Sequence, residues 1–170
     1  MKNIVLRPLR AEDAERMLAF ARAAGQETKN LTFGPEGLPL GTEAERAYLA
    51  AHGQGADSCE LGAFDGETLA ATGSVSRVAC RPRMAHRFSV AVSVRKSYWG
   101  RGIATAMMER LIAEAKARGA EVLELAVLCT NAAAIHVYEK LGFCIAGTYR
   151  KFFRYDPGEY ADAYWMNLYL

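Results

Sequence analysis

The segment that decides the fold is residues 92–104, VSVRKSYWGRGIA, which join the most continuous strand pattern of the chain to its strongest helix pattern. The strand is expected over residues 88–94 and the amphipathic helix over residues 102–118. Glycine lets a backbone approach a ligand closely, and the first amides of a helix have no partner inside it. The helix dipole adds partial positive charge there. The segment therefore predicts a site for a phosphate or pyrophosphate, with Arg101 adding charge.

Two well-known nucleotide-binding loops do not fit this segment. A Walker loop needs Lys followed by Ser or Thr after its second glycine, where Ile103 and Ala104 stand. A dinucleotide-binding turn needs glycine or alanine where Thr105 stands, and an acidic residue at the far end of the next strand. That strand, residues 121–128, carries its glutamates at its start and middle. A tight turn that uses glycine and binds nothing is the remaining alternative.

The rest of the chain alternates between strand and helix patterns. Gly25 is expected to end the first helix, capping-box chemistry to open the second, and Asp65-Gly66 to form a hairpin turn. No linker or repeat interrupts the chain, so we expect one α/β domain, residues 1–170, with a mixed sheet. The expected order is strand 4–6, helix 11–24, loop 26–41, helix 42–52, strands 59–64, 68–79 and 88–94, helix 102–118, strand 121–128, helix 131–141, and strands 143–153 and 160–169.

Length and composition limit the class of protein. A chain of 170 residues with 51% hydrophobic and 24% charged residues is typical of one globular domain. Twenty-one basic and nineteen acidic residues give a net charge of +2, too small for binding nucleic acid through a cationic field. No apolar stretch approaches the roughly 20 residues of a membrane span, and the N-terminal stretch lacks the apolar core of a secretion signal. We expect a cytoplasmic protein that binds neither nucleic acid nor membrane.

Cysteine and histidine are too scattered to suggest a metal site. The four cysteines have no CxxC spacing, and no two of the three histidines are one helix turn apart. We therefore expect no metal, and we interpret the cysteines as small, buried, reduced hydrophobic residues. A Cys–His nucleophile pair stays open, although no local motif points to one.

Asn131 and Tyr138 stand out on the helix expected over residues 131–141. They are seven residues apart, and at about 100° per residue this spacing places both side chains on one face. Asn131 also suits the N-cap of the helix, and Tyr138 suits an aromatic position at the edge of the core.

Taken together, these motifs resemble the GNAT superfamily of acetyl-coenzyme A-dependent N-acetyltransferases. The loop GRGIA, residues 100–104, is similar to the pyrophosphate-binding motif of that family, and NAAAIHVYEKLGF, residues 131–143, closely matches its second motif. The tail GEYADAYWM, residues 158–166, is similar to bacterial amino-acid and amine acetyltransferases. The resemblance covers the chain in element order and implies a GNAT fold, a mixed central sheet of about six to seven strands flanked by about four helices.

The resemblance also implies that acetyl-CoA is the co-substrate. Backbone groups of Val92 and Val94 would pair with its pantetheine arm. Asn131 would contact the arm, and Lys140 would approach it. Tyr138 would protonate the departing thiolate, so Tyr138 and Asn131 are the expected catalytic residues. The residues expected to hold the pyrophosphate are Gly100, Arg101, Gly102, Ala104 and Thr105.

Three positions depart from the family pattern. Trp99 stands where many relatives have Gln or Arg, and Ala104 replaces a frequent glycine. Ser89 stands where relatives often place a carboxylate as general base. The route for the proton of the amine therefore stays open among ordered water, His86 and Glu124, or the amine arrives already neutral.

In this fold the acceptor is expected between loop 26–41 and the turn at residues 155–159. Glu27, Phe33 and Ser89 are the candidate substrate-binding residues, although the loop side chains suit closure of the core equally well. The expected function is direct transfer of an acetyl group, in a ternary complex, to the primary amine of an amino acid or related small molecule. The alternatives are a protein N-terminal amine acetyltransferase and a non-catalytic acyl-CoA-binding module. A homodimer stays open.

Overall fold

The computed structural model describes residues 4–170, and within that range the chain forms seven strands and four α-helices. The α/β class and the expected element order are confirmed. Residues 1–3, which begin the stretch compared with a secretion signal, lie outside the described residues. The elements are β1 (Ile4–Pro8), α1 (Ala14–Glu27), α2 (Thr42–His52), β2 (Ser58–Asp65), β3 (Thr68–Arg77), β4 (Arg87–Val94), α3 (Ile103–Ala117), β5 (Val122–Leu128), α4 (Ala132–Lys140), β6 (Cys144–Asp156) and β7 (Glu159–Tyr169).

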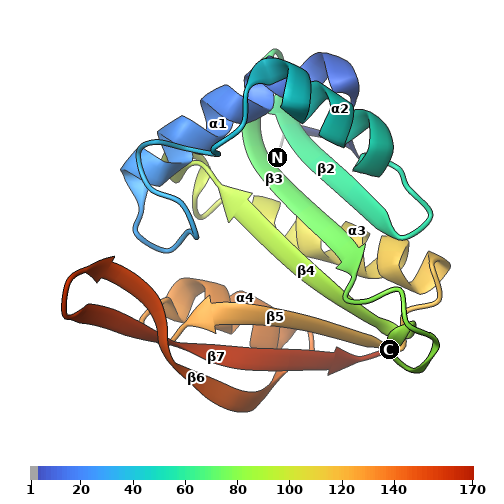
Figure 1. Ribbon diagram of the computed structural model, residues 1–170, viewed down its shortest axis with the longest axis vertical. Coiled ribbons are helices and arrows are strands. Elements are labelled where there is room, and N and C mark those ends of the chain that lie inside the picture. The colour runs from blue at the N-terminus through green and yellow to red at the C-terminus, as the bar shows by residue number, and fades with distance from the viewer. Residues whose placement is uncertain (1–3) are drawn as a thin grey trace.

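All seven strands belong to one mixed sheet in the order β1-β2-β3-β4-β5-β7-β6. Neighbouring strands are antiparallel except β4 and β5, which are parallel. The parallel pairing covers only three residue pairs and ends where Ser89 lies opposite Glu124. Beyond that point the two strands separate, as Figure 1 shows in the middle of the sheet. The sheet therefore splits between two of its central strands.

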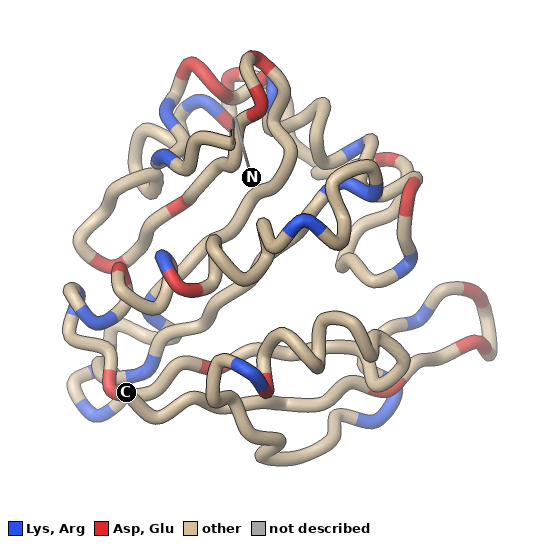
Figure 2. The backbone as a smooth tube through the Cα atoms, turned by 180° about the vertical axis from the view of Figure 1, so that it is seen from behind, with Lys and Arg blue, Asp and Glu red and all other residues tan. Residues whose placement is uncertain are grey.

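The helices cover the sheet in two layers (Figures 1 and 2). α1 and α2 lie over β2 and β3 on the face turned toward the viewer in Figure 1, where Phe20 and Leu49 pack against Phe64. α3 and α4 lie behind the sheet, and the larger core forms there around Met107 and Leu123. The front of β4, β5, β7 and β6 therefore carries no helix from residues 4–170.

Two expectations about helix ends are wrong, the end of the first helix and the cap of the second. α1 does not end at Gly25 but continues to Glu27, and Thr28 closes it by donating its N–H to the Ala24 carbonyl. Gly25 serves packing, because a Cβ at this position would lie 1.9 Å from the carbonyl oxygen of Gly34. The capping box at the start of α2 is also absent, because the N-cap is Gly41, which has no side chain to accept a hydrogen bond.

The structure confirms the expected hairpin turn but not the expected burial of all the cysteines. The hairpin turn between β2 and β3 is confirmed, with Gly66 at φ 56°. Of the cysteines only Cys59 is fully buried, whereas Cys80 and Cys144 are exposed, so the interpretation as buried hydrophobic residues is wrong for those two. Across residues 4–170, no cluster of His, Cys, Asp and Glu could hold a metal ion. In the same range, no helix is both long enough and apolar enough to cross a membrane.

Candidate functional site

The split between β4 and β5 exposes a row of backbone groups. The Arg95 amide donates to the Ala70 carbonyl, and the Arg87 carbonyl accepts from Val78, so the odd-numbered residues of β4 bond to β3. Backbone groups alternate in direction along a strand, so those of Val90, Val92 and Val94 point away from β3, toward the split. Beyond Ser89 no strand of the described part of the chain pairs with them. An extended chain with amide groups could pair there like an added strand.

The loop that follows β4 is shaped by two left-handed glycines. Gly100 has φ 72° and Gly102 has φ 76°, and a Cβ at either position would meet no atom within 4 Å. Glycine is therefore required by backbone conformation rather than by crowding. The first hydrogen bond of α3 runs from the Ala106 amide to the Gly102 carbonyl at 3.1 Å. The three preceding amides, which include those of Ala104 and Thr105, have no helical partner.

Positive charge lies beside these free amides. Arg101 is exposed, and its guanidinium carbon lies 4.9 Å from the centroid of the Tyr98 ring. The cation therefore stays close to the loop while its charge remains in solvent. Free amides at the positive end of a helix together with a cation form a site suited to phosphate groups.

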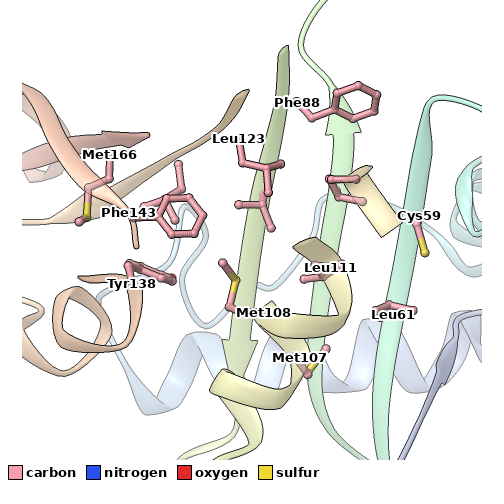
Figure 3. Close-up of a cluster of buried hydrophobic side chains, with 14 of the residues drawn as sticks. Cys59, Leu61, Phe88, Met107, Met108, Leu111, Leu123, Tyr138, Phe143 and Met166 are labelled. Atoms are coloured by element: carbon pink, nitrogen blue, oxygen red, sulfur yellow. The ribbon is translucent and has the colours of Figure 1, made fainter. Parts of the chain in front are cut away.

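Tyr138 lies behind the sheet in α4. It is 7% exposed, its ring centroid is 5.9 Å from that of Phe143, and Figure 3 shows the two rings beside each other in the core cluster. Burial raises the pKa of Tyr138 to about 12, so the hydroxyl stays protonated at neutral pH. Within residues 4–170 no side-chain or backbone group forms a hydrogen bond with it. A hydroxyl without a protein partner, on a side chain that is otherwise buried, is available as a donor to a ligand.

The other residues expected at this end lie on α4 and its cap. Asn131 is the N-cap, and its side chain accepts a hydrogen bond from the Ala134 amide at 3.3 Å. The N-cap interpretation is confirmed, while contact with a coenzyme arm stays a prediction. Lys140 is exposed at the last residue of α4.

The front of the split carries a row of polar side chains. Phe88 and Val90 belong to the core behind the sheet, so Ser89 points forward, and its Oγ lies 3.2 Å from the Oγ of Ser76. Leu123 and Leu125 also point backward, so Glu124 points forward beside Ser89.

Glu124 is 4% exposed and paired with a cation. Arg87 donates through both Nε and Nη2 to Oε2 of Glu124, with an Nε–Oε2 distance of 2.9 Å. Across the next strand pair, Asn167 lies opposite Glu124 and is 7% exposed. Its Oδ1 is the one buried side-chain polar atom in residues 4–170 without a hydrogen-bond partner. Burying such an oxygen without a partner is costly, which makes it a candidate acceptor for a ligand donor.

The floor beside this polar row is open to solvent. Ala91 in β4 and Ala126 in β5 are exposed although both lie in the middle of central strands. Alanines at such positions are normally covered, so their exposure marks the part of the sheet that α1 and α2 leave free. The open floor, the polar row and the split therefore meet at one place.

The segment after α1 and the β6–β7 hairpin contact each other. The hydroxyl of Tyr155 donates to the carbonyl of Lys29 at 3.0 Å. Phe33 is half-buried in the same segment. The Glu27 carboxylate is occupied, because it accepts from Arg95 and from the Lys96 amide. The Arg95 guanidinium beside it lowers the pKa of Glu27, so the carboxylate stays charged and bonded to the protein.

Sequence reasoning missed the contact between Trp99 and Val94, and it also missed Asn167. The alternation of Asn167 with the core residues Met166 and Leu168 signals which face it occupies. No local signal shows that β7 lies beside β5, because that neighbour is set by the sheet order.

The residues present fit acetyl-CoA. Pyrophosphate matches the free amides of the loop, and the amides of a pantetheine arm match the backbone row of Val90, Val92 and Val94, in which the Val94 carbonyl accepts from the Trp99 indole. The arm would end at the apex of the split, near Ser89 and Glu124.

A family model and several curated proteins match parts of the chain. The model of the acetyltransferase (GNAT) family matches residues 25–143. The chain is similar to the L-amino acid N-acetyltransferase AaaT of Escherichia coli K12, with 39% identity over 87 residues, 51% of this chain and 53% of that protein. It is also similar to the ribosomal protein bS18 alanine N-acetyltransferase of the same organism, with 40% identity over 67 residues, 39% of this chain and 45% of that protein. The chain thus spans about half the length of the curated relatives it matches.

Solved structures share the whole architecture. A GNAT-family acetyltransferase from Streptococcus pneumoniae has a TM-score of 0.93 at 26% identity, and the match covers 98% of this chain and 99% of that chain. The Salmonella typhimurium protein yncA, solved with its cofactor acetyl-CoA, has a TM-score of 0.84 at 20% identity, covering 99% of this chain and 94% of that chain. The second likeness shows the fold alone. With a family model matched over more than half of its length, the chain belongs to the acetyltransferase (GNAT) family.

Proposed function

We propose that the protein transfers an acetyl group from acetyl-CoA to the primary amine of a small molecule, an amino acid or related amine. One observation carries the proposal: the unpaired backbone row of β4 begins at the Ser89–Glu124 pair and leads to the glycine loop before α3. When bound, acetyl-CoA supplies a thioester, and attack of the amine on its carbonyl carbon forms the amide and releases coenzyme A as a thiolate.

Two groups of the chain would act on the reacting atoms. Negative charge develops on the carbonyl oxygen as the amine attacks, and the free backbone N–H groups of β4 are suited to donate to it. The Tyr138 hydroxyl holds a proton across neutral pH and would donate it to the leaving sulfur. Asn131 and Lys140 would contact the coenzyme from the ends of α4.

The amine would bind on the front of the split. Oε2 of Glu124 accepts both bonds from Arg87, so Oε1 remains as an acceptor, and the unpartnered Oδ1 of Asn167 lies on the neighbouring strand. Two acceptor oxygens suit the N–H groups of an amine. The proton would leave through Glu124 or through water at the Ser89–Ser76 hydroxyl pair. His86 directly precedes β4, and its carbonyl accepts from the amides of Glu121 and Val122, at the end of the β4–β5 pairing opposite to the split.

A small acceptor is favoured over a polypeptide. The contact between Tyr155 and Lys29 joins the β6–β7 hairpin to the segment after α1, so it closes one side of the floor that an extended peptide would cross. The similarity to AaaT, named as an L-amino acid N-acetyltransferase, supports the same acceptor. The similarity to the bS18 alanine enzyme favours a second candidate, a protein N-terminal amine.

A turnover assay tests the proposal. Purified protein and acetyl-CoA are incubated with single amino acids, polyamines and an Ala-initiated peptide, and free thiol and acetylated product are measured. We expect thiol release that depends on a small amine, with one N-acetyl product per thiol. Turnover confined to the peptide would establish the second candidate. Tight coenzyme binding without turnover on any amine would show instead a non-catalytic binding module.

A further inference from the structure

Glu27 connects two parts of the site that are far apart in sequence. It is the last residue of α1, and the segment from Thr28 to Gly41 follows it without helix or strand. Its partners, Arg95 and Lys96, lie 68 and 69 residues later, between β4 and the glycine loop. Figure 1 shows the ends of α1 and β4 next to each other.

Both oxygens of the Glu27 carboxylate are used. Oε1 accepts from the Arg95 guanidinium, at 3.0 Å from Nε and 2.9 Å from Nη2. Oε2 accepts from the backbone amide of Lys96 at 2.7 Å. Charge-assisted bonds of this kind are stronger than neutral ones and constrain direction. About a quarter of each of the two side chains is exposed, so the pair is partly protected from solvent screening.

One end of this contact lies at the start of the glycine loop, residues 96–102, called the cofactor loop below. Lys96 begins a short 3-10 turn, Lys96–Tyr98, that leads directly into Gly100 and Gly102. By accepting from the Lys96 amide, Glu27 therefore holds the first residue of this turn, and the turn leads the chain into the loop.

The other end lies at the start of residues 28–41, the segment expected to line the acceptor site, called the acceptor segment below. Lys29, two residues after Glu27, accepts the hydrogen bond from Tyr155, and Gly34 packs against Gly25 on the helix that Glu27 ends. Leu31 packs against the smaller core and Gly37 against Arg22 of α1, whereas the segment has few further side-chain hydrogen bonds, those accepted by Thr28 and Glu36. The position of the start of the segment thus depends in part on how α1 ends.

We propose that Glu27 is a positioning residue that couples occupancy of the cofactor loop to the order of the acceptor segment, residues 28–41. The inference rests on the proposed function. Coenzyme bound at the loop would order the 3-10 turn, the turn would hold Glu27, and Glu27 would hold the start of the segment. By thermodynamic reciprocity, an acceptor bound at the segment would then tighten the coenzyme.

Hydrogen exchange measured by mass spectrometry tests this coupling, with coenzyme A itself as the probe. In the unaltered protein we expect saturating coenzyme A to slow exchange roughly tenfold both at residues 100–105 and at residues 28–41. In Glu27→Gln, which keeps one oxygen for the Lys96 amide but loses the charge, protection at 100–105 should remain while that at 28–41 falls. Glu27→Ala should abolish the protection at residues 28–41. Arg95→Gln is a second route to the same result.

Glu114→Gln is the matched control. It breaks comparable ion pairs, from Glu114 to Arg118 at 2.7 Å and to Arg110 at 2.8 Å, at the end of α3 and away from both segments, so coenzyme-dependent protection should be unchanged. A merely structural role for Glu27 would lower the melting temperature without removing the coenzyme dependence at 28–41.

Two results would overturn the coupling while leaving the proposed function intact: equal protection of residues 28–41 in Glu27→Gln and the unaltered protein, or no such protection in either. If coenzyme A protected neither region of the unaltered protein, the proposed cofactor site would fail and the coupling with it.

Discussion

The indole N–H of Trp99 donates a hydrogen bond to the main-chain carbonyl of Val94 at 2.7 Å. That carbonyl belongs to the row that points toward the split and is proposed to pair with the pantetheine arm. Trp99 is about half exposed, so its side chain can leave without disturbing the core. The protein thus satisfies with its own side chain a group that we assign to the co-substrate.

Replacing Trp99 by Phe removes this competing donor. A neutral hydrogen bond contributes a net of about 0.5–1.5 kcal/mol, so Trp99→Phe should tighten coenzyme A by roughly two- to tenfold in a calorimetric titration. Trp165→Phe, the other tryptophan, is the control and should bind as before. Weaker binding by Trp99→Phe would show that the indole contacts the coenzyme directly.

Tyr138→Phe tests the proton donor. The substitution keeps the ring against Phe143 and removes only the hydroxyl, so we expect kcat to fall by about 10²–10⁴-fold with little change in coenzyme A affinity. The measurements are thiol release at saturating substrates and a binding titration. An unchanged kcat would exclude Tyr138 as the acid.

Gly102→Ala tests the left-handed turn before α3. An alanine at φ 76° costs about 1–2 kcal/mol, and the loop should distort where it holds phosphate. We expect coenzyme A affinity to fall about tenfold. Gly41→Ala is the matched control, because a Cβ there also meets no atom within 4 Å and φ is −83°. Equal binding by both variants would contradict the assignment.

Glu124→Gln tests the amine site. The change retains size but removes the charge paired with Arg87, so the KM for the amine should rise at least tenfold while coenzyme A affinity stays constant. Glu121→Gln, exposed just before the same strand, should have no effect. A fall in kcat with an unchanged KM for the amine would assign Glu124 to proton removal instead of binding.

Glu60→Gln tests whether the buried carboxyl of Glu60, away from the split, makes the stability of the fold depend on pH. Tyr48 donates to it at 2.9 Å, but burial dominates and raises the pKa of Glu60 to about 7 from an ordinary 4.5. The folded state therefore binds more protons than the unfolded state between these values, and stability falls as pH rises through that window. The loss is on the order of 3 kcal/mol.

The variant should remove most of this pH dependence. We expect Glu60→Gln to unfold at higher denaturant concentration than the unaltered protein at pH 8 and at no higher concentration at pH 4. Glu43→Gln, on an exposed position of α2, serves as the control. Parallel pH profiles for Glu60→Gln and the unaltered protein would place the proton elsewhere, with Glu45, whose pKa burial also raises, as the next candidate.

Local patterns gave the element order and the position of the loop because each depends on nearest neighbours along the chain. The strand–glycine–helix pattern of residues 92–104 and the seven-residue spacing of Asn131 and Tyr138 are of this kind. Boundaries that depend on packing were less predictable. Gly25 reads as a helix stop, but its missing side chain is used to let Gly34 approach, so the helix runs on.

The sequence by itself determined the family, the position of the glycine loop before α3 and the residues on each helix face, since these depend on residues close together along the chain. Only the tertiary structure decided how far β4 and β5 pair, that Glu124 lies between Arg87 and Asn167, and that Glu27 bonds to Arg95 and Lys96 rather than standing free for an amine. Those relations join residues tens of positions apart. They follow from the order and twist of the strands, which no local pattern encodes.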